Sequence, residues 1–122
     1  MPGEAHKSVV RRFFREALEN GQTAVLEEIL DPRCAYFDGG ALRFTSRDDF
    51  IEYVIEAREP YTETSVVIDE LVADGDKVAV RCEYQLATDH GRSRFAVMGF
   101  FEFREGRIIS IWRNIVAVAG HD

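Results

Sequence analysis

The sequence predicts an α+β structure in which helices cover one face of an antiparallel sheet. Two observations support this class: apolar residues recur at helical spacing before Pro60, and strand-like alternation follows it. The strand-like stretches are joined by DGD, TDHG and REG, which are typical hairpin turns. The chain has 122 residues, of which 46% are hydrophobic and 30% charged, so we expect one globular domain over residues 1–122.

Three helices are expected before Pro60. The first carries an apolar stripe made of Val10, Phe13, Phe14, Ala17 and Leu18. The pair Asn20-Gly21 ends this helix, and a second, short helix spans residues 23–30. The third helix, RDDFIEYVIEARE, follows Ser46, which forms a capping-box-like start with Asp49, and it stops at Pro60.

Five strands are expected. CAYFD, residues 34–38, forms a brief strand, and GGALRFT, residues 39–45, is interpreted as a loop. Four longer strands come next as an antiparallel meander over Thr64–Ala73, Lys77–Ala87, Ser93–Phe103 and Arg107–Val118.

The last two strands are apolar on both faces, which is unusual for a sheet with helices on one side only. A symmetric partner is the simplest cover for the second face, so we expect a homodimer through the outer face of the sheet. The residues expected at this interface are Val80, Cys82, Tyr84, Met98, Phe100 and Ile111.

The chain carries a net charge of −7, and its one basic cluster, KSVVRRFFR, is interleaved with apolar helix positions. Phosphate binding needs a basic patch, so we expect no nucleic-acid partner. No apolar run approaches the ~20 residues that span a bilayer. The N-terminal MPGEAHKS lacks the features of a signal peptide, and we therefore expect a cytoplasmic protein that does not bind membranes.

Cys34 and Cys82 lie in apolar, strand-like stretches without metal-ligand spacing, which indicates buried free thiols in a reducing compartment. The three histidines, His6, His90 and His121, are far apart in the sequence and form no ligand pattern. We therefore expect no metal site and no cofactor.

Polar side chains on the strands are the candidates for function. Trp112 and Asn114 share a strand face, as do Tyr36 and Asp38, because residues two apart on a strand point the same way. The simplest alternatives are core filling for Trp112 and a turn role for Asp38, which precedes Gly39-Gly40.

Arg81 and Glu83 lie on the more polar face of their strand. Burying them beneath the helices is costly unless they pair and form hydrogen bonds. Two interpretations therefore stay open: an inward-facing, paired Arg81 and Glu83, or a solvent-exposed face of the sheet.

The order of these elements, and VMGFFEFREGRIISIWRN at residues 97–114 in particular, resembles the nuclear-transport-factor-two-like superfamily. Its members have a cone-shaped, cystatin-like α+β fold with a pocket between sheet and helices. They include ketosteroid isomerases, SnoaL-like polyketide cyclases and limonene epoxide hydrolases. The resemblance covers nearly the whole chain and implies three N-terminal helices packed on a curved antiparallel sheet.

The closest local resemblance is to limonene epoxide hydrolase, which carries Tyr-x-Asn, Arg-x-Asp and Trp-Arg-Asp on three strands. The matching positions in this chain are Tyr36 with Asp38, Arg81 with Glu83, and Trp112 with Asn114. In that family the last Asp takes a proton from water, the Arg bridges two carboxylates, and the other acid protonates the epoxide oxygen. In this chain Asn114 stands at the position of that last Asp, and its amide cannot accept the proton. The resemblance therefore leaves Asp38 as the candidate base.

The resemblance to ketosteroid isomerase is weaker. CAYFDGG matches the strand end that carries the general base of that family, and Asp38 falls on that position. The oxyanion partners differ, because Phe14 and Gly99 stand where that family has a Tyr and a protonated Asp.

Two functions stay open. The first is a cofactor-free acid–base enzyme that acts on a small hydrophobic molecule by epoxide opening, isomerisation or cyclisation. The second is a non-catalytic domain that binds such a molecule. The expected catalytic residues are Tyr36, Asp38, Arg81 and Glu83, and the expected ligand-binding residues are Phe14, Val97, Gly99, Trp112 and Asn114.

Overall fold

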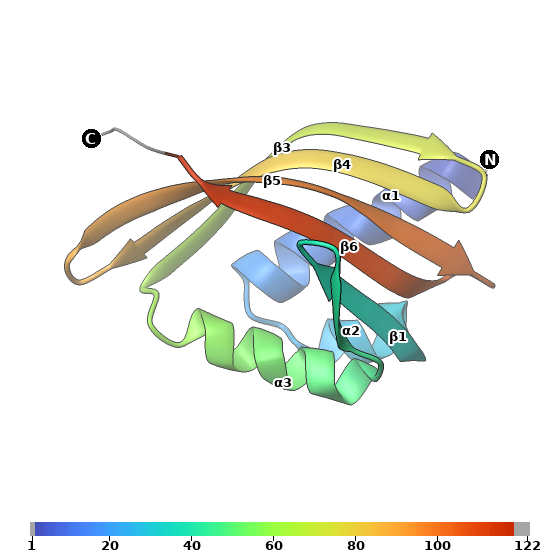
Figure 1. Cartoon of the computed structure of the whole chain (residues 1–122), viewed down its shortest axis with the longest axis horizontal. Helices are drawn as coiled ribbons and strands as arrows, with labels where there is room; N and C mark the ends of the chain where they lie inside the picture. Colours follow the sequence, from blue (N-terminus) through green and yellow to red (C-terminus); the bar gives the residue numbers. More distant parts are fainter. Residues whose placement is uncertain (1, 119–122) are drawn as a thin grey trace.

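A six-stranded sheet arches over the helices, which all lie on its concave side (Figure 1). The computed structural model describes residues 2–118. The strands are arranged in the order β2-β1-β6-β5-β4-β3, and the β1–β6 pair is parallel while its neighbours are antiparallel. The predicted α+β class, with three N-terminal helices on a curved sheet, is confirmed.

The first apolar stripe folds as two connected helical segments. Helix α1 spans Pro2–Arg12 and continues into a π-helical segment, η1, at Phe13–Glu19. A π-helix turns through a smaller angle per residue than an α-helix, because its hydrogen bonds reach five residues back. The neighbours Phe13 and Phe14 can therefore both be buried in the core.

Two further helices complete the helical layer. Helix α2 spans Ala24–Ile29, and α3 spans Arg47–Arg58. The Ser46 hydroxyl accepts a hydrogen bond of 3.0 Å from the backbone N–H of Asp49, as the sequence predicts for the start of α3. Among residues 2–118, no helix is long and apolar enough to cross a membrane.

The sheet contains one strand more than the sequence predicts. Segment 39–45 is not a loop, because Gly39 and Gly40, both at positive φ, form a tight turn that starts an edge strand. The strands are β1 (Leu30–Asp38), β2 (Ala41–Phe44), β3 (Glu63–Asp74), β4 (Lys77–Thr88), β5 (Gly91–Arg104) and β6 (Arg107–Ala117).

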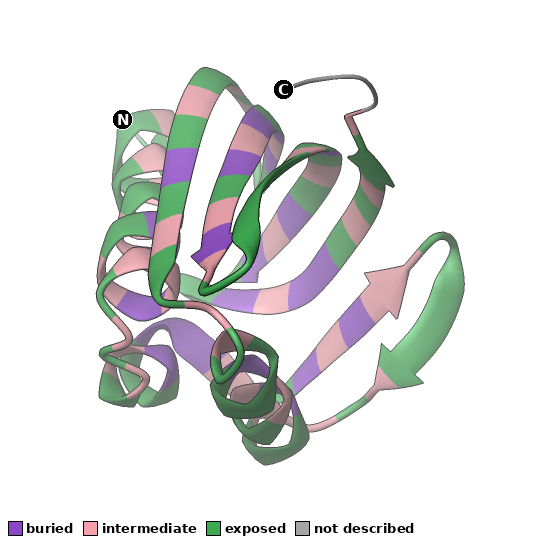
Figure 2. Ribbon diagram, turned by 90° about the vertical axis from the view of Figure 1, so that its left-hand side faces the viewer, coloured by how far each residue is buried: buried purple, intermediate pink, exposed green. Residues whose placement is uncertain are grey.

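Buried and exposed residues alternate along the long strands, which shows which face meets the helices (Figure 2). On β4 the buried residues include Val78, Val80, Cys82 and Tyr84. The predicted interface is therefore wrong in part. Val80, Cys82, Tyr84 and Ile111 are buried with the core, whereas Met98 and Phe100 are 60% and 51% exposed.

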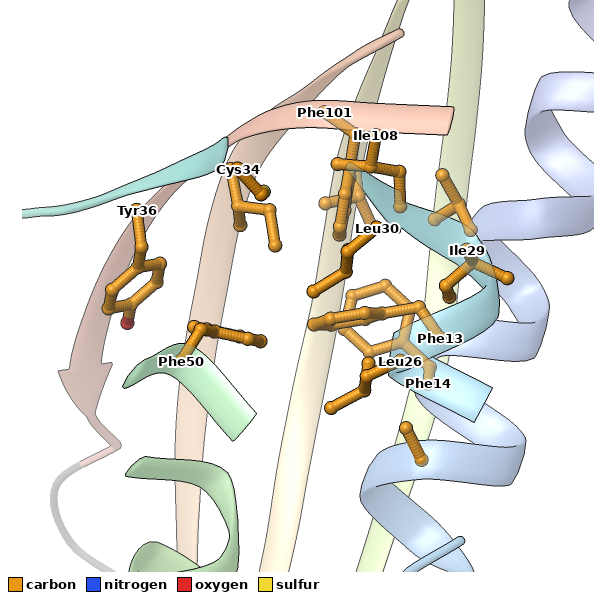
Figure 3. Packing of buried hydrophobic residues seen from close by; sticks show 14 of the residues in the cluster. Phe13, Phe14, Leu26, Ile29, Leu30, Cys34, Tyr36, Phe50, Phe101 and Ile108 are labelled. Atoms are coloured by element: carbon orange, nitrogen blue, oxygen red, sulfur yellow. The ribbon is translucent and has the colours of Figure 1, made fainter. Parts of the chain in front are cut away.

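Aromatic rings from several elements fill the core (Figure 3). Phe13 of η1 meets Phe101 of β5 edge to face, with 5.1 Å between ring centroids. Phe50 of α3 packs on Tyr36 of β1 at 5.0 Å. Cys34 and Cys82 are buried and free, as predicted, and burial raises the pKa of each thiol to about 12.

The backbones of β5 and β6 approach closely at Gly99. A Cβ atom built on Gly99 would run into the carbonyl oxygen of Trp112, which belongs to the neighbouring strand. A backbone oxygen within a sheet cannot move aside without disturbing the strand pairing. Only glycine therefore fits this position.

We expect Gly99→Ala to destabilise the fold, because the added methyl group must displace the Trp112 carbonyl. The free energy of unfolding, measured by urea denaturation, should fall by at least about 1–3 kcal/mol, the usual cost of overpacking. Ser93→Ala, at an exposed position of the same strand, should change it by less than about 0.5 kcal/mol. Equal stability of the two variants would contradict the close approach at Gly99.

Candidate functional site

A cavity of about 270 Å³ lies between the concave face of the sheet and the helices. Its walls come from η1, α3 and strands β1 and β3–β6. Most of the lining is apolar or aromatic, and its buried apolar part includes Phe13, Phe14, Phe50, Val66, Val80, Val97, Phe101 and Ile111. Such a cavity suits a small hydrophobic molecule.

Lining residues near the end of α3 and the ends of the long strands keep part of their surface. These include Ala57 in the last turn of α3 and Tyr61 just beyond the helix, together with Leu86, Phe95 and Ile115 on the strands. The opposite end of the lining, around Phe13 and Phe101, is buried. The cavity therefore opens to solvent between α3 and the strand ends.

The polar part of the cavity is built around Arg113. Its Nη2 donates hydrogen bonds to Oδ2 of Asp38 and to the hydroxyl oxygen of Tyr53, each at 2.9 Å. Tyr36 donates its hydroxyl to the same Asp38 oxygen at 3.2 Å. The side chains of Arg113 and Asp38 keep only 18% and 21% of their surface exposed. The structure thus holds a largely buried ion pair between two phenols.

Strand pairing explains why these residues meet. Asp38 and Arg113 are opposite each other where β1 and β6 run parallel, although they are far apart in the sequence. On the other side of β6, Arg113 is opposite Gly99, so no side chain from that position competes for the space. Tyr53 reaches the pair from α3, which packs against β1.

Burial shapes the protonation of this cluster. Burial alone would lower the pKa of Arg113, but the interactions of the guanidinium with Tyr84, Tyr36, Tyr53 and the Asp38 carboxylate raise this pKa by more. The net effect is a raised pKa, so the guanidinium stays charged. Burial raises the pKa of Tyr84 to about 12 and that of Tyr36 well above the usual range, although Arg113 lowers both. At neutral pH these phenols therefore keep their protons and can act as donors.

A second guanidinium, that of Arg58, also lines the cavity. Its Nε donates to the carbonyl oxygen of Leu18 at 2.8 Å, and its Nη2 donates to that of Glu19 at 3.0 Å. Arg58 thus closes the C-terminal end of η1 from α3, which fixes two walls of the cavity relative to each other.

The structure places Phe14, Val97, Gly99 and Tyr36 in the cavity lining, and Asp38 beside it through Arg113. No three His, Cys, Asp or Glu side chains within residues 2–118 are grouped closely enough to hold a metal ion. His121 lies outside the described residues.

The inward orientation considered for Arg81 and Glu83 is wrong. Both lie on the outer face of β4, where Arg81 pairs with Glu70 at 3.1 Å and Glu83 pairs with Arg94 at 2.9 Å. On that face each charged group stays hydrated and forms an ion pair, whereas the apolar residues that alternate with them along β4 fill the core. The solvent-exposed interpretation is the correct one.

The expectation that the side chains of Trp112 and Asn114 line the cavity together is also wrong. Trp112 borders the cavity, but the residue is 39% exposed and its indole stacks on Phe37, with 3.7 Å between ring centroids. Asn114 is exposed. Because side chains alternate along β6, Arg113 between them is the residue that turns inward.

Sequence reasoning missed Arg113 and Tyr53, and it placed Tyr84 on the wrong face. One signal was available: Arg113 shares its strand face with Ile111 and Ile115, whose burial would carry Arg113 inward. Tyr36 and Asp38 share β1, but Arg113, Tyr53 and Tyr84 come from β6, α3 and β4, so the spacing within one segment does not reveal the whole cluster.

Comparison with known proteins agrees with this architecture. The model of the SnoaL-like domain matches residues 10–111 of the chain. A sequence comparison with curated proteins finds no match.

Several solved structures share the fold. An LEH-like epoxide hydrolase from M. tuberculosis has a TM-score of 0.81 at 22% identity, over 95% of this chain and 86% of that one. IdmH from Streptomyces antibioticus, a provisionally assigned polyketide cyclase, has a TM-score of 0.79 at 16% identity, over 90% and 91%.

A third similar structure is a protein with a ketosteroid isomerase-like fold from Catenulispora acidiphila, in complex with trimethylamine. Its TM-score is 0.75 at 16% identity, over 86% of this chain and 82% of that one. At such identities a structural likeness establishes the fold and not the activity. The family match shows that the chain belongs to the SnoaL-like domain family, and its fold is similar to that of nuclear-transport-factor-two-like proteins, as the sequence resemblance implies.

Proposed function

We propose that this protein is a cofactor-free acid–base enzyme that binds a small hydrophobic molecule in the cavity and removes a proton from it with Asp38. The observation that carries the proposal is the Asp38–Arg113 ion pair at the edge of a mostly apolar and aromatic cavity. Functional sites are where such buried, strongly interacting charges concentrate.

The roles of the residues are derived from their hydrogen bonds. Asp38 is the base, and Tyr36 and Arg113 fix one of its oxygens so that the other is free to accept a proton. Tyr53 and Arg113 donate toward the substrate oxygen on which negative charge develops. Proton transfer next to a stabilised oxygen is the chemistry of isomerisation and cyclisation.

Epoxide opening in the manner of limonene epoxide hydrolase is a less suitable assignment. That mechanism uses an Arg-bridged second acid, and the matching Arg81 and Glu83 lie on the outer face of the sheet. A neutral phenol, Tyr53 or Tyr84, would have to protonate the epoxide oxygen instead. We therefore rank isomerase-like or cyclase-like proton transfer first.

We expect Asp38→Asn to abolish the activity, because an amide cannot accept a proton. The measurement is deuterium exchange at the α-carbon of a small enolisable ketone such as 2-tetralone, monitored by NMR in D₂O. The variant should exchange about 10²–10⁴-fold more slowly than the wild type, the usual effect of a lost general base. Asp74→Asn, at an exposed position, should retain the wild-type rate.

Unchanged exchange in Asp38→Asn would exclude Asp38 as the base. If the wild-type protein binds the ketone without exchanging it, the second candidate function, a non-catalytic ligand-binding domain, is correct. One observation favours that alternative: Arg113 and Tyr36 both engage the same Asp38 oxygen, as in a purely structural ion pair.

We also propose that the protein works as a homodimer in the cytoplasm. Exposed apolar side chains gather on the convex face of the sheet, where Met98, Phe100 and Trp112 lie next to one another across β5 and β6. A surface of this kind is usually covered by a partner, and a self-complementary sheet face suits a two-fold interface. The two free thiols fit a reducing compartment.

We expect Phe100→Glu to convert the dimer into a monomer, because it introduces two like charges at a two-fold interface that should bury upwards of ~1,000 Å². Sedimentation velocity at micromolar concentration measures the change in mass. Gln85→Glu introduces a carboxylate on the charged part of the outer face and should leave the mass unchanged. A monomeric wild-type protein would refute the dimer.

A further inference from the structure

We propose that the cavity selects a hydrophobic anion, a molecule of about two fused rings that carries one carboxylate, and that Arg113 binds this carboxylate. The inference rests on the proposed function, because it names the class of molecule that this cavity takes. It is carried by the charge of the lining and by the unused donors of Arg113.

The charge of the lining differs in sign from that of the whole chain. The described residues that line the cavity include two arginines, Arg58 and Arg113, and no Asp or Glu. Asp38 pairs with Arg113, whereas the bonds of Arg58 within residues 2–118 go to backbone carbonyl oxygens. The lining, counted together with Asp38, therefore holds one positive charge more than negative charge, inside a chain of net charge −7.

An excess charge in an apolar cavity is poorly solvated and favours a counter-ion from the bound molecule. The long-range negative field of the protein disfavours anions, so affinity for an anion must come from direct contacts within the cavity. Arg113 is suited to such contacts because a planar guanidinium matches the two oxygens of a carboxylate.

Arg113 keeps donors for that contact. Its hydrogen bonds to Asp38 and Tyr53 both use Nη2, so these two residues leave Nη1 unoccupied, and Tyr84 is a further neighbour of the guanidinium. Nε is buried and has no partner among the described residues. Buried polar groups normally have hydrogen-bond partners, so donors that Asp38 does not engage are available to a bound molecule.

Neutral phenols surround the same guanidinium. Tyr53 accepts from Arg113 through its oxygen, so its own proton stays free to be donated. Tyr84 lies close enough for Arg113 to lower its pKa, and it also lines the cavity. A carboxylate beside Nη1 would thus meet a guanidinium and at least one phenol, while the rings of the molecule occupy the apolar remainder.

The size of the cavity limits the rest of the molecule. A volume of about 270 Å³ is near the lower end of the range for sites of small ligands. Apart from Arg58, the walls beyond Arg113, such as Phe14, Val97 and Phe101, offer rings and branched side chains and no charge. One anionic group and a compact aromatic body match this lining.

The test compares two probes of nearly equal shape, 2-naphthoate and 2-naphthamide, by isothermal titration calorimetry with the full-length protein at pH 7. We expect 2-naphthoate to bind at least about tenfold more tightly, because hydrogen bonds to a charged group are stronger than those to a neutral amide. Arg113→Met should remove this preference. Arg43→Met deletes an exposed arginine and should preserve it.

Arg113→Met leaves Asp38 buried without its partner and can therefore destabilise the fold. The double variant Arg113→Met, Asp38→Asn removes both charges and is the second test of the same prediction, with folding checked by circular dichroism. Tyr53→Phe should retain the preference for the anion but reduce it, since only one donor is lost.

The outcomes separate this inference from the proposed function. If both probes bind with equal affinity, or the amide binds more tightly, the anion selectivity is refuted while the hydrophobic cavity site stands. A preference for 2-naphthoate that persists in the folded Arg113 variants refutes Arg113 as the carboxylate ligand. If neither probe binds to the folded wild-type protein, the ligand-binding cavity itself is refuted, and with it the proposed function.

Discussion

The ion pair between Asp38 and Arg113 is the interaction on which the candidate site depends. It joins β1 to β6, the parallel neighbours within the sheet, at 2.9 Å. Removing two charges from water is costly, and their mutual attraction offsets that cost only when further hydrogen bonds satisfy them. Tyr36 and Tyr53 supply those bonds, so the position of α3, which carries Tyr53, is coupled to the position of the pair.

Two uncommon local features shape the cavity beside this pair. Gly99 allows β5 and β6 to approach so closely that any other residue would strike the Trp112 carbonyl. The π-helical segment η1 presents Phe13 and Phe14 together, which builds a wall of the cavity from one short segment. A glycine within a strand is locally unfavourable, and a π-helical segment is uncommon. Both border the cavity, as expected if functional sites are where a chain departs from locally preferred structure.

The fold was predictable because its signals are local and repeated. Helical spacing, the Ser46 cap and the hairpin turns predicted three helices and the antiparallel meander without any tertiary information. The edge strand β2 was missed because it comes directly after Gly39-Gly40, and a glycine pair predicts a turn without indicating that a strand comes next.

The site was less predictable than the fold. Alternation along a strand shows which residues share a face, but it does not show which face meets the helices. Family resemblance favoured an inward Arg81 and Glu83, whereas the cost of burying charge favours the apolar Val80 and Cys82. A β-bulge adds to the difficulty: the pairing of β5 and β6 shifts between Glu102 and Phe103, which changes the alternation before Arg113.

The division of charges between the two faces explains how one sheet serves two purposes. On the outer face, Arg81 and Glu83 find partners on adjacent strands and remain in water, where such pairs contribute little to stability. On the inner face, the Asp38–Arg113 pair is largely buried, so its strength depends on each surrounding hydrogen-bond donor. A charge on the outer face can therefore be replaced with little consequence, whereas the loss of Asp38 or Arg113 alone leaves the other charge largely buried without its counter-ion. Binding of an anion at the free donors of Arg113 would act directly on the group that holds Asp38, so ligand recognition and the proposed proton transfer share a single guanidinium.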